Sequence, residues 1–146
     1  MKSTSLLKNV KVLLADDHGI FTEGLAALLR EEVELVGIVN NGQELLEAAE
    51  RLQPDIIVTD ISMPLLNGLD ALRLLKKRGV RAKVIFLTMH EDASLVAEAL
   101  HEGASGYLVK QTACIELLTA LNEVWQGREF ITSRLSGDVR SRQGQA

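Results

Sequence analysis

Five polar side chains follow or end short apolar runs, and their types suit phosphate chemistry. Asp16 and Asp17 follow the first run, and Asp60 follows the third. Thr88 ends the fourth run, and Lys110 follows the fifth. Neighbouring carboxylates repel one another, and a divalent cation that prefers oxygen, usually Mg²⁺, relieves this repulsion. An ammonium and a hydroxyl can bind phosphoryl oxygens, and a carboxylate can be the nucleophile that forms an aspartyl phosphate.

The apolar runs are typical of buried strands, and a segment with the spacing of an amphipathic helix follows each one. The predicted strands are residues 10–15, 35–39, 55–59, 83–88 and 106–109. The first predicted helix spans residues 18–30, and the second and third begin after Asn41-Gly42 and Asn67-Gly68. The fourth and fifth span residues 93–101 and 112–126, with Asp92 and Thr112 as their predicted N-caps. Five such units predict an α/β fold with a doubly wound parallel sheet.

The carboxyl ends of parallel strands meet at one edge of such a sheet, where ligands bind near the reversal of strand order. We therefore expect the five polar side chains to lie together. Taken singly, each has an ordinary structural interpretation: an acid can cap a turn, Thr88 can be a plain strand residue, and Lys110 can be a solvated surface lysine. Their combination at the strand ends favours a phosphate site with a bound cation.

Length and composition restrict the class of protein. The 146 residues, 47% of them hydrophobic, predict one globular domain at 1–130, followed by a polar linker or tail at 131–146. No apolar run approaches the roughly 18 residues of a membrane span. The single cysteine, Cys114, excludes an internal disulfide, and a cytoplasmic location is the simplest interpretation. The net charge of −4 and the 3% aromatic content argue against direct nucleic-acid binding by this chain.

The motifs resemble the receiver domain of two-component response regulators over about residues 10–127. The run VLLADDH at 12–18 is similar to the acidic opening of that family, and DISMP at 60–64, with Asn67-Gly68, is similar to its phosphoacceptor signature. FLT at 86–88 and GASGYLVK at 103–110 are similar to its threonine and lysine signatures. The DDH opening, the TMH triplet at 88–90 and the GASGYL run resemble the NarL/FixJ (LuxR-type) subfamily in particular.

The resemblance implies a flavodoxin-like (βα)5 fold with strand order 2-1-3-4-5. It implies that Asp60 accepts a phosphoryl group from a sensor histidine kinase. The metal ligands for Mg²⁺ would be Asp16, Asp17, Asp60 and the backbone carbonyl of Ser62. Thr88 and Lys110 would contact the phosphoryl oxygens.

The same resemblance implies a switch and an output. Thr88 would move inward on phosphorylation, and Tyr107 would rotate into the space left. The chain would be a regulatory domain, not an enzyme, with intrinsic Mg²⁺-dependent self-phosphorylation and autodephosphorylation. Its output domain would be a helix-turn-helix DNA-binding domain beyond Ala146 that regulates transcription, and the receiver could form a homodimer.

The sequence departs from the family pattern at three positions. Gly19 and Gln111 stand where many relatives have proline, after the Asp-Asp-His opening and after the lysine. We expect a trans peptide before Gln111, because a cis bond to a residue other than proline costs about 2.5–4 kcal/mol. Met89 is bulky where many receivers have a small residue, and we expect it to restrict access of water and small phosphodonors.

Other residues and other classes of protein were weighed beside this interpretation. His18 and His90 are interpreted as exposed loop histidines near the site, and Trp125 as closing the core under the last helix. A haloacid-dehalogenase-like hydrolase would have a second acid where Ser62 stands. A flavin or nucleotide binder would have a glycine-rich or hydroxyl-rich loop where this chain is acidic. A pseudo-receiver that acts only by binding partners stays open as the alternative.

Overall fold

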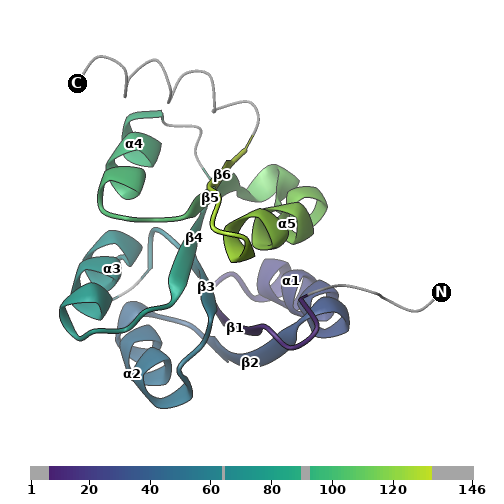
Figure 1. Cartoon of the computed structure of the whole chain (residues 1–146), viewed down its shortest axis with the longest axis horizontal. Coiled ribbons are helices and arrows are strands. Elements are labelled where there is room, and N and C mark those ends of the chain that lie inside the picture. The colour runs from purple at the N-terminus through teal and green to yellow at the C-terminus, as the bar shows by residue number, and fades with distance from the viewer. Residues whose placement is uncertain (1–6, 64, 90–92, 133–146) are drawn as a thin grey trace.

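A parallel sheet with helices on both of its faces forms the domain (Figure 1). The computed structural model describes residues 7–63, 65–89 and 93–132, so the predicted cap at Asp92, His90 and the predicted tail from residue 133 lie outside the described residues. The strands are β1 (Lys11–Ala15), β2 (Glu34–Val39), β3 (Ile56–Asp60), β4 (Lys83–Thr88), β5 (Gly106–Val109) and β6 (Phe130–Ile131). The helices are α1 (Gly19–Glu32), α2 (Gly42–Leu52), α3 (Gly68–Lys77), α4 (Ala93–His101) and α5 (Lys110–Trp125).

The strand order is β2-β1-β3-β4-β5-β6, and every neighbouring pair is parallel. This confirms the predicted flavodoxin-like order 2-1-3-4-5, with β6 as an addition at the edge. The order reverses between β1 and β3, where the chain leaves the sheet in opposite directions. Ligands bind at the carboxyl ends of the strands beside such a reversal.

Strand residues alternate between two hydrophobic cores, one on each face of the sheet. Leu13, Ile57 and Phe86 pack with α2, α3 and α4 on one face. Val12 and Ile56, each one position earlier, pack with α1 and α5 on the other face. This alternation follows from the two-residue period of a strand, and it also decides to which face each residue at a strand end points.

Side-chain caps define where α2 and α3 begin. Asn41 accepts a hydrogen bond from the Glu44 amide, and Asn67 accepts one from the Asp70 amide, both at 2.9 Å. The starts predicted after Asn41-Gly42 and Asn67-Gly68 are therefore correct to within one residue, since each helix begins at the glycine itself, with an asparagine N-cap of a preferred type. At α1, His18 is the N-cap, but its side chain makes no capping bond, so its ring is available for other contacts.

Two predictions about α5 are wrong. The helix begins at Lys110 with Val109 as its N-cap, so Thr112 lies inside the helix, where its hydroxyl donates to Glu116 at 2.8 Å. Trp125 does not close the core, because its side chain is 41% exposed. The buried face of α5 ends with Val124, and the next residue is rotated about 100° away from that face.

The short strand β6 was not predicted. It pairs with β5, and the residue after it is tied to the same strand: the Thr132 amide donates to the Tyr107 carbonyl, and the Val109 amide donates to the Thr132 hydroxyl, both at 2.9 Å. The sheet therefore extends beyond residue 130, where the domain was predicted to end.

The described residues contain no cis peptide bond, which agrees with the expected trans bond before Gln111. No described helix is long and apolar enough to cross a membrane.

Candidate functional site

Asp16, Asp60 and Lys110 meet at the carboxyl edge of the sheet. Each is the residue at or just after the end of its strand, and the strand alternation points all three toward the face covered by α1 and α5. The Lys110 Nζ lies 2.8 Å from Asp60 Oδ2 and 3.0 Å from Asp16 Oδ2. All three residues are buried. The ammonium therefore compensates two carboxylates that water cannot fully solvate.

His18 contributes a ring nitrogen to the same cluster. Its Nδ1 lies 2.8 Å from Asp16 Oδ1 and 2.7 Å from Lys110 Nζ, and 3.4 Å from a carboxylate oxygen of both Asp17 and Asp60. The side chain is 52% exposed, as expected for a loop histidine, but Nδ1 faces inward. Adjacency to the acidic pair was the only sequence signal for this contact, because sequence does not fix the direction of the ring.

Phe21 is a second contact that sequence reasoning missed. The Lys110 Nζ lies 4.9 Å from the centroid of the Phe21 ring, which is within the range of a cation–π interaction. An aromatic residue on the apolar side of α1 is typical of core packing, so the pattern gives no sign of this role. The Phe21 ring therefore adds an aromatic partner to the carboxylates that already surround the ammonium.

A cavity of about 250 Å³ opens beside Asp60. It is lined by Asp17, His18, Asp60, Ser62, Thr88 and Met89. The Ser62 amide donates to Asp60 Oδ1 at 2.9 Å, while Lys110 binds Oδ2, so each oxygen of this carboxylate is held by a different donor. Met89 is 57% exposed at the cavity wall. A cavity needs only about 10–15 Å³ of such space to hold one water, so this cavity has room beside Asp60 for a group much larger than water.

The predicted switch residues lie on the other face of the sheet. Thr88 ends β4 and Tyr107 lies in β5, and the alternation turns both toward the core formed with α2, α3 and α4. Both are buried, and the Tyr107 ring packs edge-on against Phe86 with a centroid separation of 6.5 Å. Thr88 also reaches the cavity beside Asp60, so it is adjacent to both the acceptor and the core.

The acidic residues fit a divalent cation. Asp16, Asp17, His18 and Asp60 each offer a ligand atom, and these atoms lie within 4.8 Å of one another. Asp16 Oδ2 is buried within ion-pair distance of Lys110, yet it accepts no hydrogen bond from the described part of the chain. Three carboxylates with an unsatisfied oxygen form a donor set suited to a hard cation such as Mg²⁺. Ser62, whose carbonyl is the fourth predicted ligand, lines the same cavity.

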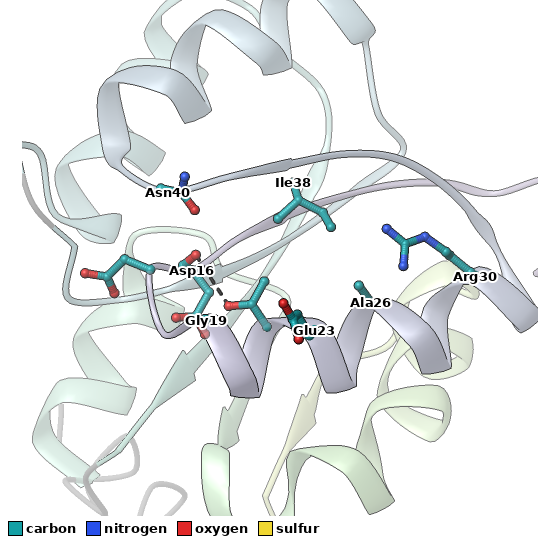
Figure 2. Close-up of a pocket in the computed structure, with 9 residues that line it drawn as sticks. Asp16, Gly19, Glu23, Ala26, Arg30, Ile38 and Asn40 are labelled. Carbon is teal, nitrogen blue, oxygen red and sulfur yellow. Dashed lines mark hydrogen bonds between the residues drawn. The ribbon is translucent and has the colours of Figure 1, made fainter.

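A second cavity, also of about 250 Å³, lies between α1 and β2 (Figure 2). Asp16 and Asn40 lie at one end of it and Arg30 at the other, with Ile38 from β2 facing Ala26 from α1. The second cavity touches the back of the acidic pair, but it contains neither Asp60 nor Lys110. The cavity beside Asp60 is therefore the candidate reaction site.

Comparison with known proteins assigns the chain to one family. A family model described as "Response regulator receiver domain" matches residues 12–122, and the chain belongs to this family. Its relatives place it among the NarL/LuxR-type receivers, which confirms the resemblance seen in the sequence.

Two curated relatives and one solved structure illustrate the similarity. The transcriptional regulatory protein LnrK of Bacillus subtilis (strain 168) is 39% identical over 132 residues, which cover 89% of this chain and 60% of LnrK. The nitrate/nitrite response regulator protein NarL of Escherichia coli (strain K12) is 32% identical, over 86% of this chain and 59% of NarL. The LuxR-family response regulator of Aurantimonas sp. SI85-9A1 superimposes with a TM-score of 0.86 at 26% identity, over 93% of this chain and 99% of that chain. The chain thus spans about 60% of the length of these curated relatives.

Proposed function

We propose that the chain is the phosphoacceptor domain of a response regulator and that Asp60 is the acceptor. The observation that carries this proposal is the placement of Asp60: one oxygen is bound by the buried Lys110 ammonium, and the carboxylate lines an open cavity. A carboxylate in a purely structural ion pair would not need an open space for a second group. The family membership supports the same role.

The proposed reaction moves one phosphoryl group. An Asp60 carboxylate oxygen attacks the phosphorus of a phosphohistidine on a sensor kinase, so an O–P bond forms and the P–N bond breaks. The electron pair of that bond stays on the imidazole nitrogen, which takes up a proton. Lys110 and Thr88 bind the phosphoryl oxygens and hold them in position.

We assign the Mg²⁺ ligands to Asp16, Asp17, Asp60 and the Ser62 carbonyl. When bound, Mg²⁺ neutralises charge on the phosphoryl oxygens. The chain's own contribution is to keep the carboxylates of Asp16 and Asp60 close together, which the buried Lys110 ammonium makes energetically acceptable.

The proposed output is a change in packing around β4 and β5. Thr88 would shift toward a phosphoryl group on Asp60, and Tyr107 would settle into the vacated space; the inward Tyr107 ring is one of the two positions that this switch requires. We infer that an attached DNA-binding domain reads this change. Full-length relatives support that inference, since LnrK is named a transcriptional regulatory protein and RcsB has been solved as dimers bound to DNA.

The proposal is tested by incubating the protein with acetyl phosphate and Mg²⁺ and then measuring its intact mass. We expect wild type to gain one phosphoryl group and Asp60→Asn to gain none, and we expect chelation of Mg²⁺ to abolish the gain. An unmodified wild type, with binding of beryllofluoride also absent, would contradict the proposal. It would favour the pseudo-receiver alternative, in which the chain only binds partners.

A further inference from the structure

His18 Nδ1 lies where the three acidic side chains converge. It is within 3.4 Å of an oxygen from each of Asp16, Asp17 and Asp60. The four ligand atoms lie within 4.8 Å of one another, so Nδ1 borders the same space as the three carboxylates and one cation can contact all four.

Hydrogen bonds of the backbone hold His18 in position, and the ring reaches the carboxylates from there. The His18 amide donates to Asp16 Oδ1 at 2.9 Å, and the His18 carbonyl accepts from the Thr22 amide at 2.9 Å and from the Thr22 hydroxyl at 3.0 Å. The residue is therefore held on both sides of its Cα, between the acidic pair and the first turn of α1. The ring is directed inward from a fixed position rather than from a free loop.

The hydrogen-bond roles of Nδ1 conflict in the described contacts. A neutral imidazole nitrogen carries either one proton or one lone pair. Nδ1 cannot both donate to Asp16 at 2.8 Å and accept from the Lys110 ammonium at 2.7 Å. A divalent cation removes the need for either hydrogen bond, because it accepts the lone pair of Nδ1 and binds the carboxylates, while the Lys110 ammonium retains Asp16 and Asp60 as partners.

We propose that His18 Nδ1 is a direct ligand of the divalent cation in this site, beside the carboxylates of Asp16, Asp17 and Asp60. The inference rests on the proposed function, since it concerns the same cation. Imidazole suits transition metals, whereas Mg²⁺ prefers oxygen ligands. The nitrogen ligand therefore shifts the preference of the site toward Mn²⁺ relative to Mg²⁺.

The test measures binding and coordination of the metal, without any reaction. Mn²⁺ and Mg²⁺ are titrated by calorimetry into wild type, His18→Asn and the control His101→Asn, which alters an exposed histidine at the end of α4. Pulsed electron paramagnetic resonance of the Mn²⁺ complexes then detects any directly coordinated nitrogen. Circular dichroism confirms that each variant is folded.

We expect a coordinated-nitrogen signal in wild type and in His101→Asn, and its loss in His18→Asn. Loss of a group that only supports a ligand typically weakens metal binding by about 10–100-fold. Since the nitrogen favours Mn²⁺ over Mg²⁺, we expect His18→Asn to weaken Mn²⁺ binding more than Mg²⁺ binding, so that the ratio of the two affinities falls about tenfold. The inference is overturned if wild type binds Mn²⁺ without the nitrogen signal. It is also overturned if His18→Asn binds both cations more tightly, because His18 would then obstruct the site.

The two proposals can fail separately. If wild type gains a phosphoryl group with Mg²⁺ but shows no nitrogen ligand, only the role of His18 is wrong. If neither cation binds and no phosphoryl group is gained, the proposed function is wrong and the inference falls with it.

Discussion

Lys110 is the residue on which the charge balance of the site depends. Its ammonium contacts Asp60, Asp16 and His18 and lies over the ring of Phe21. It is also the first residue of α5, directly after β5. One side chain thus links the acceptor, the acidic pair and the element that leads toward the end of the chain.

Replacement of Lys110 by methionine is expected to destabilise the domain in the absence of divalent cations. The change keeps most of the side-chain volume but leaves two buried carboxylates without a cation, which should lower the free energy of unfolding by about 3–5 kcal/mol. Urea denaturation in the presence of a chelator measures this loss. Lys77→Met, at an exposed position in α3, is the control and should change stability by about 0.5 kcal/mol or less. Equal stability of the two variants would contradict the assigned role of Lys110.

The sequence predicted the site residues that lie at strand ends. It did not predict contacts that depend on the direction in which a side chain points. Asp16, Asp60 and Lys110 meet because parallel strands end at one edge, which is a property of the backbone that periodicity reveals. The inward ring nitrogen of His18 and the contact of Phe21 with the ammonium depend on side-chain rotamers and on the position of α1. The spacing of residues along the sequence determines neither of them.

The connection between β3 and α3 approaches the acceptor closely. Gly68, the first residue of α3, donates its amide to the Ile61 carbonyl at 2.8 Å. A Cβ at Gly68 would lie 2.8 Å from both the Asp60 carbonyl oxygen and a Phe86 ring carbon. The absence of a side chain here lets the helix begin directly against the strand that carries the acceptor.

We therefore expect Gly68→Ala to destabilise the domain by about 1–3 kcal/mol, as overpacking does. Gly24→Ala is the matched control, because a Cβ at that position in α1 meets nothing within 4 Å. It should raise the free energy of unfolding by about 0.5–1 kcal/mol, since alanine favours the helix. Chemical denaturation of both variants measures the two changes. A neutral or stabilising Gly68→Ala would show that the contact with β3 is not tight.

The strand β6 is an element of the domain through Thr132. The buried Thr132 hydroxyl accepts from the Val109 amide and donates to Glu116 at 3.0 Å, so it joins β5 to α5. Sequence did not predict this strand because two residues are too few to show a period. We therefore expect the folded domain to include residues 131 and 132.

Thr132→Val tests this role, because it keeps the shape but removes the acceptor of the Val109 amide. The unsatisfied buried N–H should cost about 1–3 kcal/mol, and hydrogen exchange at Val109 should accelerate. Thr112→Val also removes a hydroxyl bonded to Glu116, together with its 3.4 Å contact with the Val109 carbonyl, but it leaves the acceptor of the Val109 amide in place. It should produce a smaller loss of stability and unchanged exchange at Val109. The same exchange rate in both variants would contradict the structural role of β6.

The doubly wound sheet of five βα units was predictable, although β6 was not, because its determinants are periodic and local. Five βα units, the alternation of buried strand residues and the capping asparagines all specify one doubly wound sheet. The errors lie at the ends of elements: α5 begins two residues before Thr112, and Trp125 lies one position beyond the buried face. Element ends are decided by tertiary contacts such as that of Lys110 with the acidic cluster, which local patterns do not encode.

The net negative charge of the whole chain predicts that it does not bind DNA. With a net charge of −4, the chain has little capacity to neutralise phosphates, and we expect it not to bind a fluorescently labelled duplex at low salt. Fluorescence anisotropy measures this directly. Binding that weakens as salt is added would show a basic surface within this chain and would remove the need for a separate DNA-binding domain.

The position of the phosphoryl group on the chain tests the central proposal most directly. After treatment with acetyl phosphate and Mg²⁺, borohydride reduces an aspartyl phosphate to homoserine, and peptide mass mapping locates that residue. We predict homoserine at position 60 alone, with Asp16 and Asp17 unchanged. Homoserine at position 16 or 17, or at none of the three, would contradict the assignment of Asp60 as the acceptor.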